Sequence, residues 1–174
     1  LWNKSADDRI WRLERGALQE LPTRGLTGMP VQTLASDREG RLWVGTVGSG
    51  ASRMSVDGNS WALVNAFGGL PSGTVNVLEA EGDSMWIGTP AGIAFWNGST
   101  ITGSLPIFGQ PSPFASNNIT GVVAHPETLF VSTSGGNYFS ERATGLRFWT
   151  EMNQSMFSTD VRALVTNDTL LFCM

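Results

Sequence analysis

Cysteine and histidine are almost absent from this chain of 174 residues, which contains one of each. Because Cys173 stands alone, an internal disulfide cannot form. With His125 as the only imidazole, a zinc site built from histidine and cysteine is excluded, and a serine triad would lack its strained nucleophile turn. We therefore predict no catalytic residue, no metal site and no cofactor, and we expect a protein that is not an enzyme.

Charged side chains are also scarce, at 15% of the residues against roughly 25% in an average soluble domain. The net charge is −4, and no lysine or arginine occurs from Met54 to Glu141. A nucleic-acid partner is therefore excluded, because binding phosphates requires a cationic surface. No run of about 18 apolar residues occurs, so membrane insertion is not expected. Since the chain begins with Leu1 and shows no signal peptide, we expect a mature form, a fragment or part of a larger protein.

Glycine, with 21 residues, and tryptophan, with seven, are abundant, and they mark an internal repeat. The motif Leu-Trp-Val-Gly-Thr at 42–46 returns as Met-Trp-Ile-Gly-Thr at 85–89 and as Leu-Phe-Val-Ser-Thr at 129–133. Weaker copies, Leu-Trp at 1–2 and Leu-Phe at 171–172, lie outside this series with nearly the same spacing. A second anchor precedes the motifs at the same period: Val31, Val75, Ile119 and Val161. Two independent anchors with one period indicate a structural repeat.

Each period contains the pattern of four short strands. An alternating apolar run such as 75–78 is followed by a turn rich in Asp and Gly, such as 37–40, and then by the strand with the aromatic motif. A third strand such as 92–96 and a fourth such as 61–64 or 146–149 complete the period. Four strands in a repeat of about 40–45 residues are typical of a β-propeller blade.

The predicted fold class is therefore all-β, a β-propeller of four-stranded antiparallel blades with about four repeats present. The best helical window, 9–21, falls on the third and fourth strands of a repeat. We expect the repeats to form part of a ring of roughly six to eight blades. The expected division is a partial blade, three blades and a second partial blade: 1–28, 29–68, 69–114, 115–156 and 157–174. We expect the aromatic residues of the motif strands to form the core between blades: Trp2, Trp43, Trp86, Phe130 and Phe172.

The segment Asp-Arg-Glu-Gly-Arg-Leu-Trp-Val-Gly-Thr at 37–46 resembles the two-component regulator propeller repeat. So does the series of Gly-Leu-Pro-Ser-Gly-Thr-Val, Met-Trp-Ile-Gly-Thr, Gly-Ile and Trp-Asn-Gly-Ser between 69 and 99. A degenerate copy at 117–136 has Phe-Val-Ser-Thr in place of Trp-x-Gly-Thr. The resemblance implies propellers of the kind found in extracytoplasmic parts of bacterial sensor kinases, where they sense glycans, and in secreted or cell-surface proteins.

From this resemblance we expect a non-enzymatic propeller outside the cytoplasm, either periplasmic, at the cell surface or secreted. Its partner would be a glycan or a protein, and further blades would come from a longer chain or a larger assembly. One alternative is a structural propeller within a surface or secretion assembly. Another is a propeller lyase, a mechanism that needs His and Glu near a metal.

The binding surface is expected at one rim, where the loops between second and third strands meet the links between blades. Asn, Ser and Gly orient a ligand there, and aromatic faces stack on it. The rim residues selected as candidate ligand-binding residues are Ser49, Ser72, Phe114, Asn117, Asn137 and Tyr138.

Other chemically suggestive residues are better explained as turns. His125 falls between two strands of the repeat, and the glycine-rich loop at 48–50 precedes no helix that would bind phosphate. Glu79, Glu81 and Asp83 have the ligands for Ca²⁺, but we expect a solvated hairpin turn. Five Asn-x-Ser/Thr sequences would carry glycans in a eukaryotic secreted protein and would reflect only turn composition in a bacterium: Asn3, Asn97, Asn118, Asn153 and Asn167.

Overall fold

The computed structural model describes residues 2–4, 9–21, 30–107, 109–146, 149–152, 164–167 and 170–173. Their regular elements are strands, apart from two 3-10 turns, η1 (Ala66–Gly68) and η2 (Arg142–Thr144). The window with the best helical pattern forms the hairpin of β2 (Ile10–Glu14) and β3 (Ala17–Glu20). The all-β prediction is therefore confirmed. No helix in the described segments is long and apolar enough to cross a membrane.

Three antiparallel sheets of four strands follow one another along the chain, and we name them blades A, B and C. Blade A contains β4 (Val31–Ser36), β5 (Leu42–Thr46), β6 (Ala51–Met54) and β7 (Trp61–Val64). Blade B contains β8 (Val77–Glu81), β9 (Ser84–Thr89), β10 (Gly92–Trp96) and β11 (Ile101–Leu105). Blade C contains β12 (Ile119–Ala124), β13 (Thr128–Thr133), β14 (Gly136–Glu141) and β15 (Thr150–Glu151).

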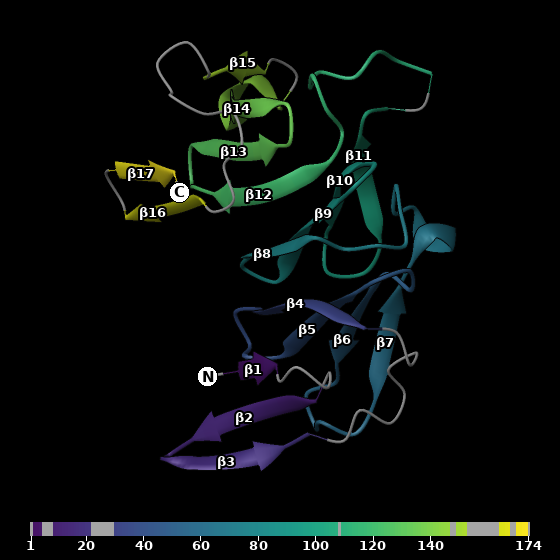
Figure 1. Ribbon diagram of the computed structural model, residues 1–174, viewed down its shortest axis with the longest axis vertical. Coiled ribbons are helices and arrows are strands. Elements are labelled where there is room, and N and C mark those ends of the chain that lie inside the picture. The colour runs from purple at the N-terminus through teal and green to yellow at the C-terminus, as the bar shows by residue number, and fades with distance from the viewer. Residues whose placement is uncertain are drawn as a thin grey trace.

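Shorter sheets flank the three blades. Strand β1 (Trp2–Lys4) pairs with β2, which pairs with β3, on one side, and β16 (Leu164–Asn167) pairs with β17 (Leu170–Cys173) on the other. Figure 1 shows the sheets in succession along the molecule, with both chain ends on the same side. The first strands β4, β8 and β12 lie side by side, so they are the inner strands of adjacent blades. This is the predicted propeller arrangement, while the boundaries between blade segments stay predictions.

The glycine of the repeated motif permits the blades to approach closely. A Cβ atom added to Gly88 would lie 2.5 Å from Cγ1 of Val77 and 2.7 Å from Cγ2 of Ile119 in the next blade. A Cβ on Gly45 would likewise lie 2.7 Å from Cγ1 of Val75, which directly precedes blade B. The two anchors of the sequence repeat share one period because Val75 and Ile119, the second anchors at blades B and C, each pack on the glycine of the blade before.

The threonine that ends the motif fixes the turn into the third strand of every blade. Its buried hydroxyl donates a hydrogen bond across the turn in all three cases, at 2.8 Å from Thr46 to the Gly50 carbonyl, 2.8 Å from Thr89 to Gly92 and 2.9 Å from Thr133 to Gly136. The same oxygen accepts a backbone N–H from within the loop, for example that of Ala91 at 3.2 Å. The Gly-Thr pair therefore encodes one inter-blade contact and one turn.

The motif tryptophans are buried between blades, as predicted. Trp43 packs edge-on against Trp96 of blade B, with ring centroids 4.9 Å apart, and Trp86 belongs to the core shared by blades B and C. The Arg53 guanidinium lies 4.6 Å from the Trp96 ring centroid. Its pKa is lowered mainly by burial, and the nearby positive charge of Arg41 lowers it further. Phe130 is half-buried and contacts Phe139 of its own blade. The side chains of Trp2 and Phe172 lie outside the described residues.

Two glutamates join blade B to blade C, so the prediction that they lie in a solvated turn is wrong. Glu81 accepts a hydrogen bond from Trp86 Nε1 at 2.7 Å, and its carboxylate pairs bidentately with Arg142 of blade C at 2.9 and 3.0 Å. Glu79 lies on inner strand β8 and accepts the backbone N–H of Ala124 at 3.2 Å. Burial raises the pKa of Glu79, and the nearby charge of Glu81 also raises it. Both residues are in β8, and the turn begins only after Glu81.

Two strand boundaries also differ from those predicted. Strand β8 begins at Val77 because the N–H of Val75 is donated to Thr46 of blade A, at 2.9 Å, instead of to its own sheet. The fourth strand of blade C begins at Thr150 and not at Leu146, because Gly145 and Leu146 have φ values of 67° and 58°. These left-handed conformations interrupt an extended chain.

We predict that Gly88→Ala lowers the free energy of unfolding by about 1–3 kcal/mol, because the added methyl group overpacks the junction of blades B and C. Gly68→Ala is the matched control, since a Cβ there meets nothing within 4 Å and its φ is not left-handed. Chemical denaturation monitored by tryptophan fluorescence measures both changes. Equal stability of the two variants would contradict the account of the repeat.

We predict that Glu79→Gln raises the melting temperature near neutral pH. Because the folded-state pKa of Glu79 is raised, its burial as a carboxylate costs stability above that pKa, and the cost disappears as pH falls toward the unfolded-state value. The amide can still accept the N–H of Ala124. The advantage of the variant should therefore shrink in acid, as measured by thermal unfolding across pH. Glu127→Gln, in an exposed turn, is the control, and a pH-independent gain in Glu79→Gln would count against this assignment.

Candidate functional site

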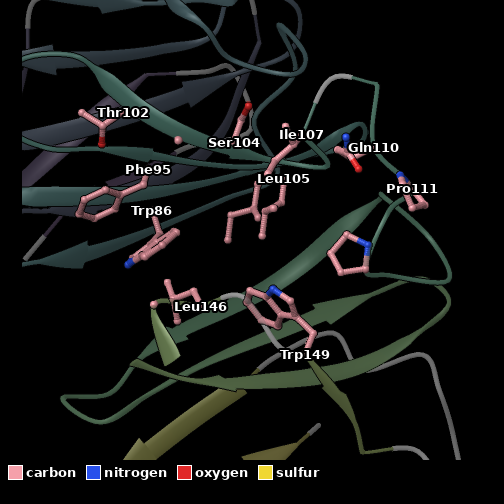
Figure 2. A pocket seen from close by; sticks show the side chains of 14 residues that line it. Trp86, Phe95, Thr102, Ser104, Leu105, Ile107, Gln110, Pro111, Leu146 and Trp149 are labelled. Atoms are coloured by element: carbon pink, nitrogen blue, oxygen red, sulfur yellow. The ribbon is translucent and has the colours of Figure 1, made fainter. Parts of the chain in front are cut away.

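A cavity of about 910 Å³ opens between blades B and C. Its walls come from β9, β10 and β11, from the link after β11, and from the segment before β15. The lining residues that Figure 2 labels are Trp86, Phe95, Thr102, Ser104, Leu105, Ile107, Gln110, Pro111, Leu146 and Trp149. We call this cavity the B–C groove.

The alternation of strand β10 explains which side chains reach the groove. Ala94 and Trp96 point into the core shared with blade A, so Ile93 and Phe95 point to the opposite face, toward blade C. Gly103 of β11 pairs with Phe95, and a Cβ built on Gly103 would meet no atom within 4 Å. The absence of a side chain at this position leaves space beside the Phe95 ring.

The opposite wall depends on the backbone after η2. The left-handed conformation of Leu146 turns the chain after Gly145, and both Leu146 and Trp149 line the groove. Figure 2 shows Trp149 across the cavity from Leu105 and Trp86. Phe114 supports this wall from behind, with its ring centroid 5.0 Å from that of Trp149. The groove is therefore bounded by aromatic rings from two different blades.

The polar groups of the groove are few, and one of them is buried without a partner. Nε1 of Trp149 is inaccessible to solvent and has no hydrogen-bond acceptor among the described residues. The side chains of Thr102 and Gln110 make no hydrogen bond in the part of the chain that the structure describes, and both are exposed at the edge. Among the described residues that line the groove there is no Asp, Glu, Lys, Arg or His, and the Trp86 indole is already bonded to Glu81.

Loops and links between blades do meet at the predicted rim, but only three of the six candidate residues are accessible to solvent there. The N–H of Gly50 bonds to the carbonyl of Gly73 at 2.6 Å, which joins the loop of blade A to the following link. Ser49, Ser72 and Asn117 are half-buried in these loops. The Ser72 hydroxyl accepts the N–H of Thr74 at 3.2 Å, and Asn117 accepts the Ser112 hydroxyl at 2.6 Å. Ligand binding by these three residues stays a prediction.

The other three candidates lie inside the protein, which corrects their assignment to an exposed rim. Asn137 and Tyr138 are in strand β14, which begins at Gly136, and they are 2% and 4% exposed. Phe114 is 5% exposed, with its ring centroid 5.1 Å from that of Tyr138, whose hydroxyl accepts the N–H of Ala115 at 2.8 Å. Asn137 accepts the hydroxyl of Ser132. Phe114 and Tyr138 therefore hold the link after blade B onto blade C, whereas the Asn137 side chain bonds within blade C.

The remaining candidates occupy turns or blade contacts. His125 closes the hairpin between β12 and β13 through two backbone hydrogen bonds with Thr128. Within the described segments, no group of three or more His, Cys, Asp or Glu is placed to hold a metal ion. Asn97 is in an exposed turn, whereas Asn118 accepts a hydrogen bond from Asn76 at 2.9 Å. Asn153 lies outside the described residues, as do the side chains of Asn3 and Asn167, and glycosylation stays a prediction.

The sequence interpretation missed the groove. The repeat pattern places Trp149 on a fourth strand, and it does not separate Gly103 from the glycines of turns. An aromatic residue near the outer strand of a blade, together with a glycine directly opposite another aromatic residue, is the signal that points to such a cavity.

Comparisons with known proteins extend the sequence resemblance. The profile of the family described as "Two component regulator propeller" matches residues 25–48. No curated protein matches the chain. Solved structures do match, including an extracellular domain assigned to a one-component system of B. thetaiotaomicron, with a TM-score of 0.69 and 15% identity over 99% of this chain and 28% of that chain.

Two further structures have the same fold. An extracellular domain assigned to a hybrid two-component system of B. thetaiotaomicron gives a TM-score of 0.63 at 17% identity, over 94% of this chain and 24% of that chain. A catalytically inactive virginiamycin B lyase from Staphylococcus aureus, with quinupristin, gives 0.62 at 15% identity, over 94% of this chain and 58% of that chain. The chain thus spans 28% and 24% of the two extracellular domains. Residues 25–48 thus match the two-component regulator propeller repeat, and the chain has a β-propeller fold.

Proposed function

We propose that this chain is a ligand-binding part of an extracytoplasmic, non-enzymatic propeller of the sensor type, whose partner is a glycan or a protein. The observation that carries the proposal is the B–C groove, which is open, as large as a small-molecule site and bounded by aromatic rings. Two of the similar structures are extracellular domains assigned to one-component and two-component systems, which supports a location outside the cytoplasm.

A sensor has to change its structure when a ligand binds, and the groove lies where blades B and C meet. A ligand there would contact β11 of blade B and Trp149 beside blade C at the same time. Binding would therefore favour one relative placement of the two blades, because a ligand shifts an equilibrium only through differential contacts. The junction that resists such a shift is the Glu81–Arg142 pair.

We predict that the chain binds at least one glycan or protein partner, and that binding changes its tryptophan fluorescence, because Trp86 and Trp149 line the groove. A glycan array combined with a pull-down from the source organism tests the first part, and titration with the captured partner tests the second. If the array detects no glycan and the pull-down detects no protein, the proposal is overturned. A permanent stoichiometric complex with no small ligand would favour the structural alternative.

We also predict that the chain leaves quinupristin intact, although one similar structure is a lyase with that molecule. Nδ1 of His125 faces its own turn, 3.5 Å from the N–H of Glu127, and the lining of the groove contains no histidine or acid. Incubation followed by mass spectrometry measures cleavage. Turnover that is lost in His125→Ala, with unchanged melting temperature, would establish the enzyme alternative.

A further inference from the structure

A second cavity, of about 300 Å³, lies on blade A where β6 turns into β7. Among the described residues that line it are two arginines, Arg41 and Arg53, and no acid. Apolar side chains, among them Val56 and Trp61, form another part of the wall. We call this cavity the blade A pocket. It shares no lining residue with the B–C groove, so it is a separate place on the molecule.

The two arginines of the pocket differ in how their charge is satisfied. Arg41 donates from Nε to Asp37 at 2.7 Å, and its Nη1 pairs with Glu39 at 3.0 Å. Arg53 makes no hydrogen bond and no ion pair with any residue that the structure describes. Its N–H donors are therefore available to an acceptor that enters the pocket.

Two aromatic rings hold the Arg53 guanidinium in place. Its central carbon lies over the Trp96 ring, 4.6 Å from the centroid, and 5.8 Å from the centroid of the Trp43 ring. Contact with an aromatic ring uses the face of the planar group, whereas the N–H donors lie at its edge. Because the group is already positioned by the two rings, a ligand would lose little affinity to the ordering of this side chain.

The charges around Arg53 restrict the anion that fits beside it. Burial and then the charge of Arg41 lower the pKa of Arg53, and the charges of Asp37 and Glu39 only partly offset them. These two carboxylates would repel a dianion such as phosphate more strongly than a monoanion. A carboxylate carries a single charge, and its two oxygens match two parallel N–H donors of a guanidinium. A carboxylate is therefore the anion that these surroundings favour.

The apolar part of the wall favours a ligand with an apolar body. Val56 is 80% exposed although it is hydrophobic, and Trp61 is half-buried beside it in the lining. A ligand that covers these side chains removes apolar surface from water, which stabilises the complex. A cavity of about 300 Å³ limits this body to a small group such as one aromatic ring.

We propose that the blade A pocket binds a small organic monocarboxylate, with its carboxylate at the edge of the Arg53 guanidinium and its apolar body against Val56 and Trp61. This site is independent of the ligand-binding function proposed for the B–C groove, so each proposal can fail without the other.

Substitution of the arginine tests the polar half of the site. Arg53→Gln deletes the charge and the guanidinium edge, and it should weaken carboxylate binding at least about tenfold. Arg38→Gln is the matched control, because it removes an exposed arginine of the same blade that does not line the pocket. It should leave the affinity unchanged.

A second substitution keeps the test valid if Arg53→Gln lowers stability. Val56→Glu places a negative charge at a largely exposed position of the wall, where no buried contact is lost, and should also weaken binding. Val56→Gln has nearly the same shape without the charge and is its control. The difference between these two variants measures the recognition of charge alone.

The experiment titrates the full chain with sodium benzoate at constant ionic strength, with sodium acetate, benzamide and sodium phosphate as comparisons. Isothermal titration gives the affinity of each variant, and the Nε–Hε signal of Arg53 in the NMR spectrum of the isotope-labelled chain locates the site. We expect saturable binding of benzoate that shifts this signal, weaker binding of acetate and no binding of benzamide.

The proposal is supported if Arg53→Gln and Val56→Glu weaken benzoate binding while Arg38→Gln and Val56→Gln do not. Any of four results overturns it: no saturable binding of benzoate, equal binding of benzamide, tighter binding of phosphate, or benzoate binding that Arg53→Gln and Val56→Glu leave intact. Acetate that binds as tightly as benzoate overturns the assignment of the apolar wall.

Discussion

The close contact between a motif glycine and the β-branched anchor of the next blade is the constraint on which the structure depends. Val75 packs on Gly45 and Ile119 packs on Gly88, at distances that leave no room for a methyl group on either glycine. This contact fixes how far the inner strands of adjacent blades stand apart. Once the inner strands are set, the buried tryptophans complete both junctions, and the pair of Glu81 with Arg142 adds to the junction of blades B and C. The propeller geometry thus follows from a pair of residues repeated at one period.

The same constraint explains why a groove forms between blades B and C. The blades are tied together at the inner strand by Glu79 and by the glycine contact, so space between them remains only toward β11, the outer strand of blade B. Gly103 leaves that space unfilled, and the left-handed turn at Leu146 brings Trp149 to its far wall. A cavity with aromatic rings on its walls results from these local features.

The sequence predicted the fold well because the residues that repeat are those that make the contacts between blades. The sequence-based prediction failed at residues whose side chains contact the link or the next blade instead of solvent. Tyr138 and Phe114 look like exposed rim aromatics, but blade C uses them to hold the preceding link. Glu79 and Glu81 look like turn carboxylates, but Arg142 and Ala124 of the next blade contact them. Such partners are separated by tens of residues, and no local pattern predicts them.

The proposed function places the main ligand contacts between two blades, whereas the sequence alone predicts them on the rim loops. Hydrogen–deuterium exchange of the full chain, with and without its bound glycan, tests this claim most directly. The account predicts slower exchange in β11 and at residues 149–152, on the two walls of the B–C groove. Protection confined to the rim, at residues 47–50 and 115–118, with β11 unchanged, would contradict it.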